Sequence, residues 1–238
     1  MAEDIRASGK TAPDDAVLLR HPRRRTTLLE VELIALTQYL RESGRPEGLI
    51  EHAGRVCYRS TGKGDPASFI QSRIREGHES IIEHACATFE VSGISRACSH
   101  QLVRHRLASY SQESQRYVDL SELALVVPPS VENNAAARAV WDRLTEQMTE
   151  AYQALRELGI RKEDARFLLP NATATRIVVT MNFRELLHFF RIRIHPAAQW
   201  EICRMAVRML RIVEAEAPAV FGPLAAELRS GHPQLFED

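Results

Sequence analysis

Residues 134–158 constrain the fold more than any other stretch of this 238-residue chain. Apolar side chains recur there at steps of three and four residues, which is the spacing of one face of an α-helix. They are Val140, Trp141, Leu144, Met148, Ala151, Tyr152, Leu155 and Leu158. The pattern predicts one long helix whose apolar stripe belongs to the core.

Shorter segments predict both strands and helices. Strands are predicted where β-branched and apolar residues concentrate, at residues 28–36, 87–95 and 173–183. Helices are predicted from caps and helical spacing, at residues 46–60, 65–77, 95–106, 161–170, 183–194 and 197–217. Pro46 suits a first helical turn and Ser95 suits a helix cap.

These elements predict one domain. They do not alternate as regular βαβ units, and the sequence has no GxGxxG loop, so a Rossmann domain is not expected. Neither a repeat nor a Gly/Ser linker divides the chain. We predict a single α+β domain over residues 28–238, with a central mixed or antiparallel sheet flanked by helices. Residues 1–27 are polar and aperiodic, which predicts a mobile N-terminal tail.

Charge and cysteine usage exclude several classes of protein. Lys and Arg together number 31 and so do Asp and Glu, so the chain has no net field to attract nucleic acid or an acidic membrane. No apolar run approaches the roughly 20 residues of a membrane span, and no secretory signal precedes the domain, which predicts a cytoplasmic protein. Four cysteines without a CxxC pair predict reduced, mostly buried thiols and no catalytic thiol; they are Cys57, Cys86, Cys98 and Cys203.

The segment LVRHRLASYSQESQRYV, residues 102–118, carries the strongest functional signal. Arg104, His105 and Arg106 are predicted to close a helix. Cations at this end interact favourably with the negative end of the helix dipole, so the triplet alone does not require a functional role. Hydroxyl, amide and guanidinium groups follow directly, as a phosphate or a planar heterocycle requires. A local anion site for a mononucleotide is therefore predicted.

This segment also resembles a known enzyme family. RHR, seven intervening residues and then Ser114 form the RHRx7S pattern of flavin-dependent thymidylate synthases. The resemblance extends over residues 46–215 and includes GHESIIEHACATFEV before the motif, with ARFLLPNATATRIVVTMNFRELLHFF and RIRIHPAAQWEI after it. It implies methylation of dUMP to dTMP with 5,10-methylenetetrahydrofolate, tightly bound FAD and NADPH, without a cysteine nucleophile. It also implies a homotetramer with active sites shared between subunits.

The resemblance assigns roles to individual positions. It implies that FAD contacts His78, Ser80, Arg104, His105, Arg106, Gln112, Asn182, Phe183, Arg184 and His188. It implies that dUMP contacts Gln101, Leu102, Val103, Arg104, Gln112, Glu113, Ser114, Gln115, Arg116, Arg166 and Arg193. Arg193 matches the arginine that activates the pyrimidine at N3. Ser114 is interpreted as a phosphate ligand, because no nearby residue is an obvious base to activate it as a nucleophile.

Two positions depart from the common family pattern. Gln112 stands where many relatives have Glu, and Ala197 stands where a histidine is expected, with His195 two residues earlier. Two other functions remain open from the sequence. An RNA-binding module would stack bases on Tyr110 and Tyr117, and a zinc hydrolase would use His78, His84 and Cys86, although the HExxH spacing is absent.

Overall fold

One antiparallel sheet organises the protein. The computed structural model describes residues 28–41, 44–60, 64–117 and 124–237, and in these ranges four strands pair in the order β1-β2-β4-β3. They are β1 (Glu30–Leu36), β2 (Cys86–Ser95), β3 (Ala108–Gln112) and β4 (Ala174–Asn182). The α+β prediction is confirmed, and each of these strand pairs is antiparallel. The predicted tail, residues 1–27, lies outside the described residues.

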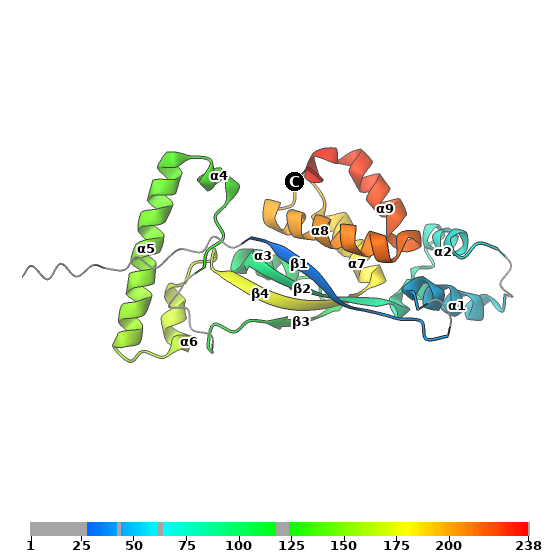
Figure 1. The fold of residues 1–238 in the computed structure, drawn as a ribbon, viewed down its shortest axis with the longest axis horizontal. Coiled ribbons are helices and arrows are strands. Elements are labelled where there is room, and N and C mark those ends of the chain that lie inside the picture. The colour runs from blue at the N-terminus through cyan, green and yellow to red at the C-terminus, as the bar shows by residue number, and fades with distance from the viewer. Residues whose placement is uncertain (1–27, 42–43, 61–63, 118–123, 238) are drawn as a thin grey trace, which may run out of the picture.

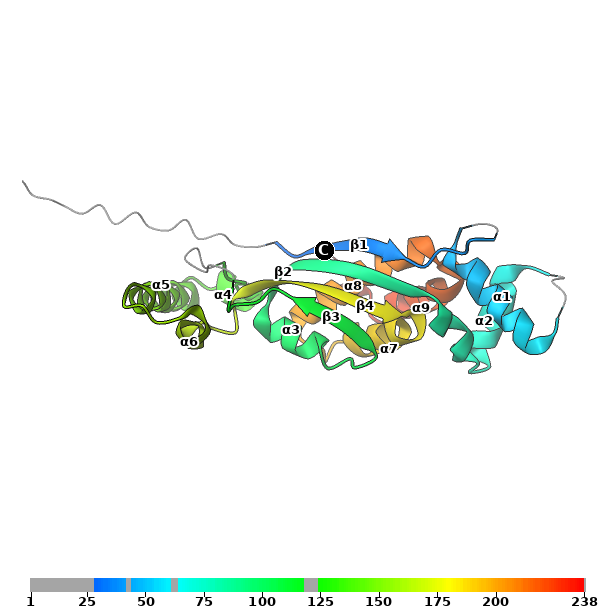
Figure 2. The same cartoon turned by 90° about the horizontal axis from the view of Figure 1, so that it is seen from below.

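Helices cover one face of this sheet. Figures 1 and 2 show α7 (Phe183–Arg193), α8 (Trp200–Glu216) and α9 (Pro218–Gly231) on the same side, and α3 (Arg96–Leu102) packs against α8, β2 and β4. The strand sequences explain this arrangement, because successive strand residues point to opposite faces. In β2, Ala87, Phe89 and Val91 are buried, whereas Thr88 and Glu90 between them are only half-buried.

The core lies between the sheet and these helices. Phe183 and Phe190 of α7 both pack on Phe221 of α9, with ring centroids 4.8 and 5.9 Å apart. On α8 the buried side chains recur at helical spacing and include Met205 and Leu210. Burial of this apolar stripe, rather than helix propensity, stabilises α8 in place.

The other face of the sheet is polar. Thr88 and Thr180 form a hydrogen bond of 2.9 Å across β2 and β4, and Arg176 lies 3.5 Å from Glu90. Among the helices that the structure describes, none covers this face (Figure 2).

Two groups of helices extend beyond the ends of the sheet (Figure 1). One end carries α1 (Pro46–Tyr58), α2 (Pro66–Arg75) and the 3₁₀ helix η1 (Glu79–His84). The other end carries α4 (Pro129–Glu132), α5 (Ala135–Glu157), α6 (Lys162–Ala165) and the 3₁₀ helix η2 (Arg166–Leu168). A further 3₁₀ helix, η3 (Pro233–Leu235), follows α9.

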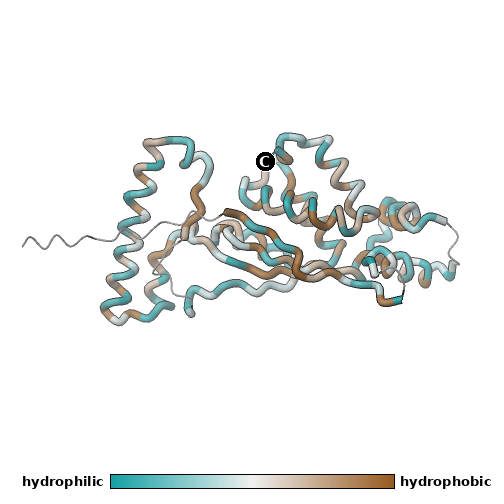
Figure 3. The backbone as a smooth tube through the Cα atoms, in the orientation of Figure 1, coloured by the Kyte–Doolittle hydropathy of each residue, from teal (hydrophilic) through white to brown (hydrophobic). Residues whose placement is uncertain are grey.

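The long helix was predicted correctly, but the burial of its apolar stripe was not. Val140, Leu144 and Leu158 are 56%, 52% and 78% exposed. Tyr152 is fully buried, and it packs with Ala165 and two partly buried neighbours in a cluster separate from the main core. Figure 1 shows why: α5 stands beyond the end of the sheet, and Figure 3 shows a mainly hydrophilic helix with scattered apolar residues.

The prediction that Arg104, His105 and Arg106 close a helix is also wrong. Helix α3 begins at the predicted cap, where Ser95 Oγ accepts from the Cys98 N–H at 3.0 Å, but it ends at Leu102. The Tyr110 hydroxyl donates to the carbonyl oxygens of Leu102 and His105, at 2.9 and 2.7 Å. These two bonds tie β3 to the end of α3, and the RHR triplet lies in the link between α3 and β3.

Among the described strands and α-helices, β3, α4 and α9 had no counterpart in the sequence prediction. Strand β3 was interpreted only as a run of ligand side chains. The described helices include none that is long and apolar enough to cross a membrane.

Candidate active site

Arg193 lies at the end of α7, where two contacts fix its guanidinium. Its Nε donates to His105 Nε2 at 3.0 Å, and its Nη2 donates to the Gln101 carbonyl oxygen at 3.3 Å. Arg191 instead lies 3.6 Å from Glu79, because residues two apart on a helix point to different sides. The Nη1 group of Arg193 has no hydrogen bond or ion pair with the part of the chain that the structure describes.

His105 is the buried partner of Arg193. Its side chain is surrounded by protein, with the Phe189 ring edge-on at 4.9 Å and Glu185 Oε1 at 3.3 Å from Nδ1. Burial lowers the pKa of His105 to about 4, and the positive charges of Arg193 and His188 act in the same direction. The imidazole is therefore neutral at neutral pH and can accept a hydrogen bond.

A cationic cluster lies beyond the end of β3, beside α6 and η2. The Arg116 guanidinium is 3.2 Å from the Glu163 carboxylate. The backbone N–H of Arg116 donates to Ser114 Oγ at 3.3 Å. Arg166 Nε donates to the Glu163 carbonyl oxygen at 3.1 Å. Two guanidinium groups and a hydroxyl thus share one small region, which is the donor set that a phosphate requires.

Arg96 belongs to the same cluster, although the sequence analysis did not select it. Its Nη1 donates to the Glu113 carbonyl oxygen at 3.3 Å. Burial lowers the pKa of Arg96, and the nearby charge of Arg166 lowers it further. One sequence feature could have identified Arg96. It is the first residue of α3 and follows a strand directly, so its polar side chain is held near the end of the sheet.

The predicted FAD residues of η1 and α7 form a third group. His78 Nδ1 is hydrogen-bonded to the Tyr58 hydroxyl, with the two rings stacked, and Ser80 is exposed on η1. Arg184 contacts Glu83 at 2.5 Å and Glu79 at 3.4 Å, so its charge is already paired. His188 is exposed one turn further along α7.

Asn182 and Phe183 have structural roles at the start of α7. Asn182 Oδ1 accepts from the Glu185 N–H at 2.8 Å and caps the helix. The Phe183 ring is fully buried, so only its backbone is available to a ligand.

The remaining predicted dUMP residues differ in exposure. Gln112 Nε2 donates to Ser99 Oγ at 2.8 Å and to Thr175 Oγ1 at 3.3 Å, so this amide faces into the protein. Leu102 is fully buried, whereas Val103 is exposed and Gln115 is half-buried.

The structure therefore brings some predicted site residues together and separates others. Gln101, His105 and Arg193 are in contact. The cationic cluster lies at the end of the sheet near α6, whereas η1 packs against α1 at the opposite end (Figure 1). Within one chain, the predicted phosphate ligands and the predicted η1 ligands lie at different ends of the sheet.

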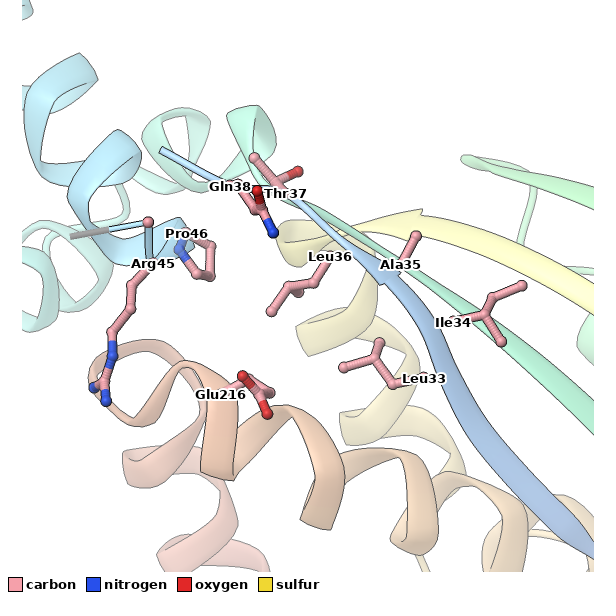
Figure 4. Close-up of a pocket in the computed structure, with 10 residues that line it drawn as sticks. Leu33, Ile34, Ala35, Leu36, Thr37, Gln38, Arg45, Pro46 and Glu216 are labelled. Carbon is pink, nitrogen blue, oxygen red and sulfur yellow. The ribbon is translucent and has the colours of Figure 1, made fainter. Parts of the chain in front are cut away.

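A pocket of about 510 Å³ lies away from all three groups. It is bordered by β1, the segment before α1 and the end of α8, and Figure 4 shows Leu33 and Leu36 pointing toward α8, with Arg45 and Glu216 also lining it. It contains none of the predicted site residues, whereas a second pocket of about 390 Å³ is lined by Glu113, one of the predicted dUMP ligands.

The exposed cations fit a flavin nucleotide. Arg104 and Arg106 are exposed, and neither guanidinium meets a carboxylate within the described ranges. Unpaired guanidinium groups suit the phosphates and the anionic ring of a reduced flavin. Across residues 28–41, 44–60, 64–117 and 124–237, no three His, Cys, Asp or Glu side chains are arranged to hold a metal ion.

Comparisons with known sequences also point to a flavin-dependent enzyme family. Residues 36–219 match the family described as "Thymidylate synthase complementing protein". A protein from Geobacter sulfurreducens named flavin-dependent thymidylate synthase is 47% identical over 199 residues, covering 79% of this chain and 84% of that protein. Proteins of the same name from Nitratidesulfovibrio vulgaris and Mycobacterium tuberculosis are 42% and 40% identical, covering 83% and 82% of this chain and 87% and 90% of their own lengths.

A solved structure shares the fold. It is a UMP/dUMP methylase, PolB, from Streptomyces cacaoi, bound with 5-Br UMP. The TM-score is 0.71 at 26% sequence identity, and the match covers 86% of this chain and 95% of that one. With a family match over residues 36–219 and relatives of 40–47% identity, this chain belongs to the flavin-dependent thymidylate synthase family.

Proposed function

We propose that the protein methylates dUMP to dTMP, with 5,10-methylenetetrahydrofolate as the carbon donor and NADPH as the reductant of bound FAD. Family membership supports this reaction, and the structural neighbour is itself described as a UMP/dUMP methylase. The observation that carries the proposal is the fixed guanidinium of Arg193, which has Nη1 left for a ligand.

Arg193 activates the pyrimidine in this proposal. Carbon 5 of uracil is a poor nucleophile, so negative charge in the ring has to be stabilised before carbon 5 attacks the methylene group. A guanidinium at N3 and the adjacent carbonyl provides this stabilisation, and it stays protonated at neutral pH. Because His105 and the Gln101 carbonyl hold two of its N–H groups, little reorganisation is needed when dUMP binds.

The cationic cluster binds the nucleotide phosphate. Ser114 supplies a hydroxyl and its backbone N–H, and Arg116 and Arg166 supply charge. Arg96, which is half-buried, adds a third guanidinium near Arg166. The ion pair of Arg116 with Glu163 is half-exposed, so a phosphate dianion can replace the carboxylate at little cost.

The flavin would be held by two exposed sets of side chains. Arg104 and Arg106 would meet its phosphates or its ring, and His78, Ser80, Arg184 and His188 would line the η1 and α7 side. When bound and reduced, FAD supplies the hydride that completes the methyl group. The residues themselves orient the cofactor and balance its charge.

No cysteine takes part in the proposed reaction. Burial raises the pKa of the Cys86, Cys98 and Cys203 thiols, which disfavours the thiolate that a nucleophile requires. Cys57 is exposed on α1, outside the three groups of predicted ligands.

We also propose a homotetramer in which each active site draws on more than one subunit. The phosphate ligands and the η1 ligands lie at different ends of one chain, so contributions from a neighbouring chain would bring them together. The exposed apolar side chains of α5 provide surface for such contacts. Light scattering should then give four times the 26.9 kDa mass of one chain.

An anaerobic assay tests the reaction. The FAD-loaded protein is incubated with dUMP, methylenetetrahydrofolate and NADPH without oxygen, and dTMP is measured by chromatography. Absence of dTMP from folded, FAD-loaded protein would refute the proposed function.

A protein lacking all four cysteines, if folded, should still form dTMP. Complete loss of dTMP formation traced to one thiol, with ligand binding intact, would show that the reaction uses a different chemistry.

A further inference from the structure

We propose that Glu185 is a positioning residue for Arg193 and acts through His105. The three side chains contact one another in series, with Glu185 and His105 buried and Arg193 half-buried. Glu185 Oε1 lies 3.3 Å from His105 Nδ1, and His105 Nε2 accepts from Arg193 Nε at 3.0 Å. This inference rests on the proposed function, because it concerns the arginine assigned to pyrimidine activation.

The chemistry of the three groups fixes where the proton of His105 lies. A guanidinium can only donate, so His105 Nε2 has to be the acceptor in its contact with Arg193. A neutral imidazole with a free lone pair on Nε2 carries its hydrogen on Nδ1. Nδ1 is the ring nitrogen that lies 3.3 Å from the Glu185 carboxylate. Glu185 thus stabilises the tautomer that Arg193 requires.

Burial makes the carboxylate hard to replace. Glu185 and His105 are each only 6% exposed, so water does not readily take the place of a missing acceptor. The charged and titratable groups around the imidazole are Glu185, His188 and Arg193; the last two are basic. Among the described residues, Glu185 is the carboxylate within ion-pair distance of His105.

A simpler role for Glu185 is to complement the dipole at the start of α7, where it lies in the first turn. A side chain with only this role would be expected at the surface, because burial of a carboxylate is unfavourable. Burial does raise the pKa of Glu185, so its position is opposed by desolvation. The contact with His105 gives the burial a function that the dipole does not.

Loss of the carboxylate should release Arg193. If the His105 hydrogen moves to Nε2, two N–H groups face each other at the imidazole–guanidinium contact, and that contact breaks. Arg193 would retain its bond to the Gln101 carbonyl and would be free to rotate about it. Misplacement of a catalytic group by about 1 Å can reduce turnover by about a hundredfold.

Nuclear magnetic resonance of the ¹⁵N-histidine-labelled full-length protein reads the tautomer directly. The His105 ring signals are assigned by their loss in His105→Gln. We expect the wild type to show hydrogen on Nδ1, Glu185→Gln to preserve this state because its amide oxygen accepts, and Glu185→Met to shift the hydrogen toward Nε2. Glu47→Gln and Glu47→Met are matched controls, since Glu47 is a half-buried glutamate in the first turn of α1, and neither should alter the His105 signals.

Kinetics complete the test. Glu185→Met should lower kcat for dTMP formation by about tenfold to a hundredfold while FAD affinity stays within about twofold, and Glu185→Gln should restore most of the turnover. A wild-type signal with hydrogen on Nε2 would overturn the inference without any variant, even if Glu185→Met failed to fold. A tautomer shift in Glu185→Met without loss of kcat would overturn the positioning role. If the wild type made no dTMP, the proposed function would fail while the tautomer measurement still decided the contact.

Discussion

Glu201, in the first turn of α8, accepts two hydrogen bonds from Ser95 at the end of β2. The backbone N–H of Ser95 donates to Glu201 Oε1 and its hydroxyl donates to Glu201 Oε2, each at 2.6 Å. Both residues are buried. The same hydroxyl accepts from the Cys98 N–H at 3.0 Å and caps α3. One carboxylate therefore fixes the junction of β2, α3 and α8, directly before the segment that carries Gln101 and the RHR triplet.

The first prediction concerns this junction. Glu201→Gln should lower the free energy of unfolding by about 1–3 kcal/mol, because an amide accepts with one oxygen only and a buried donor loses its partner. Urea unfolding at a fixed protein concentration measures the loss. Glu216→Gln is the control, since it makes the same change at the exposed end of α8 and should stay within about 0.5 kcal/mol of the wild type. Equal effects of the two changes would contradict the structural role of Glu201.

The second prediction concerns Gly93, which lies at an irregularity in the pairing of β2 with β4. Its φ of 70° is in the left-handed region, and a Cβ at this position would lie 2.1 Å from the Leu28 carbonyl oxygen. Gly93→Ala should destabilise the protein by more than the roughly 1–2 kcal/mol of a left-handed alanine, because the backbone before β1 has to move as well. Gly159→Ala measures the cost of the left-handed conformation alone, since Gly159 has a φ of 82° and open space around it. Thermal melting that shows equal losses for both would argue against the close approach to Leu28.

The third prediction is a pH dependence of stability from His105. Its pKa in the folded protein is about 4, below the ordinary value of about 6.5 in an unfolded chain. Between these values the unfolded chain binds more protons than the folded one, so stability falls as the pH is lowered from about 6.5 toward 4. His105→Gln should therefore lose less stability than the wild type between pH 7 and pH 5. Parallel losses in the two proteins would show that His105 does not carry this dependence.

Local patterns predicted much of the fold. Concentrations of β-branched and apolar residues located β1, β2 and β4, and caps such as Asp65, which accepts from the Ser68 N–H at 2.9 Å, located the start of α2. Strand β3 escaped prediction because its sequence ASYSQ is polar and its pairing with β4 joins segments far apart in the chain. Periodicity showed that α5 has an apolar stripe, but it carries no information on what covers that stripe.

The candidate site shows the same limit. The resemblance selected Arg193 and His105, and the structure places them in contact across 88 residues of sequence. Glu185 was not selected, because an acidic residue in the first turn of a helix looks ordinary in the sequence. Only the structure reveals that this carboxylate lies 3.3 Å from an imidazole nitrogen of the link between α3 and β3.

The fourth prediction separates the two ligands. Arg116→Ala should chiefly weaken dUMP binding, because Arg116 lies with Ser114 in the cationic cluster, whereas Arg106→Ala should chiefly weaken FAD binding. Removal of a charge-assisted contact costs about 1.5–3 kcal/mol, or roughly tenfold to a hundredfold in affinity. Isothermal titration with each ligand measures both effects. Arg143→Ala removes the same charge from an exposed position on α5 and should change neither affinity. Equal losses for both ligands in Arg116→Ala and Arg106→Ala would refute the division.

The last prediction tests Arg193 itself. Arg193→Ala should reduce methyl transfer by about a hundredfold to a thousandfold or more, as expected when a preorganised donor to developing charge is lost, while FAD remains bound. Arg193→Lys should recover little, because an ammonium group cannot contact His105, the Gln101 carbonyl and a planar N3 and oxygen edge at once. Arg191→Ala is the matched control on the same helix: its partner is Glu79, so turnover should remain close to the wild type. Single-turnover measurement of dTMP at saturating dUMP distinguishes the variants. Near-native turnover in Arg193→Ala would show that another arginine activates the pyrimidine, and Arg191 or Arg166 would then be the residue to test.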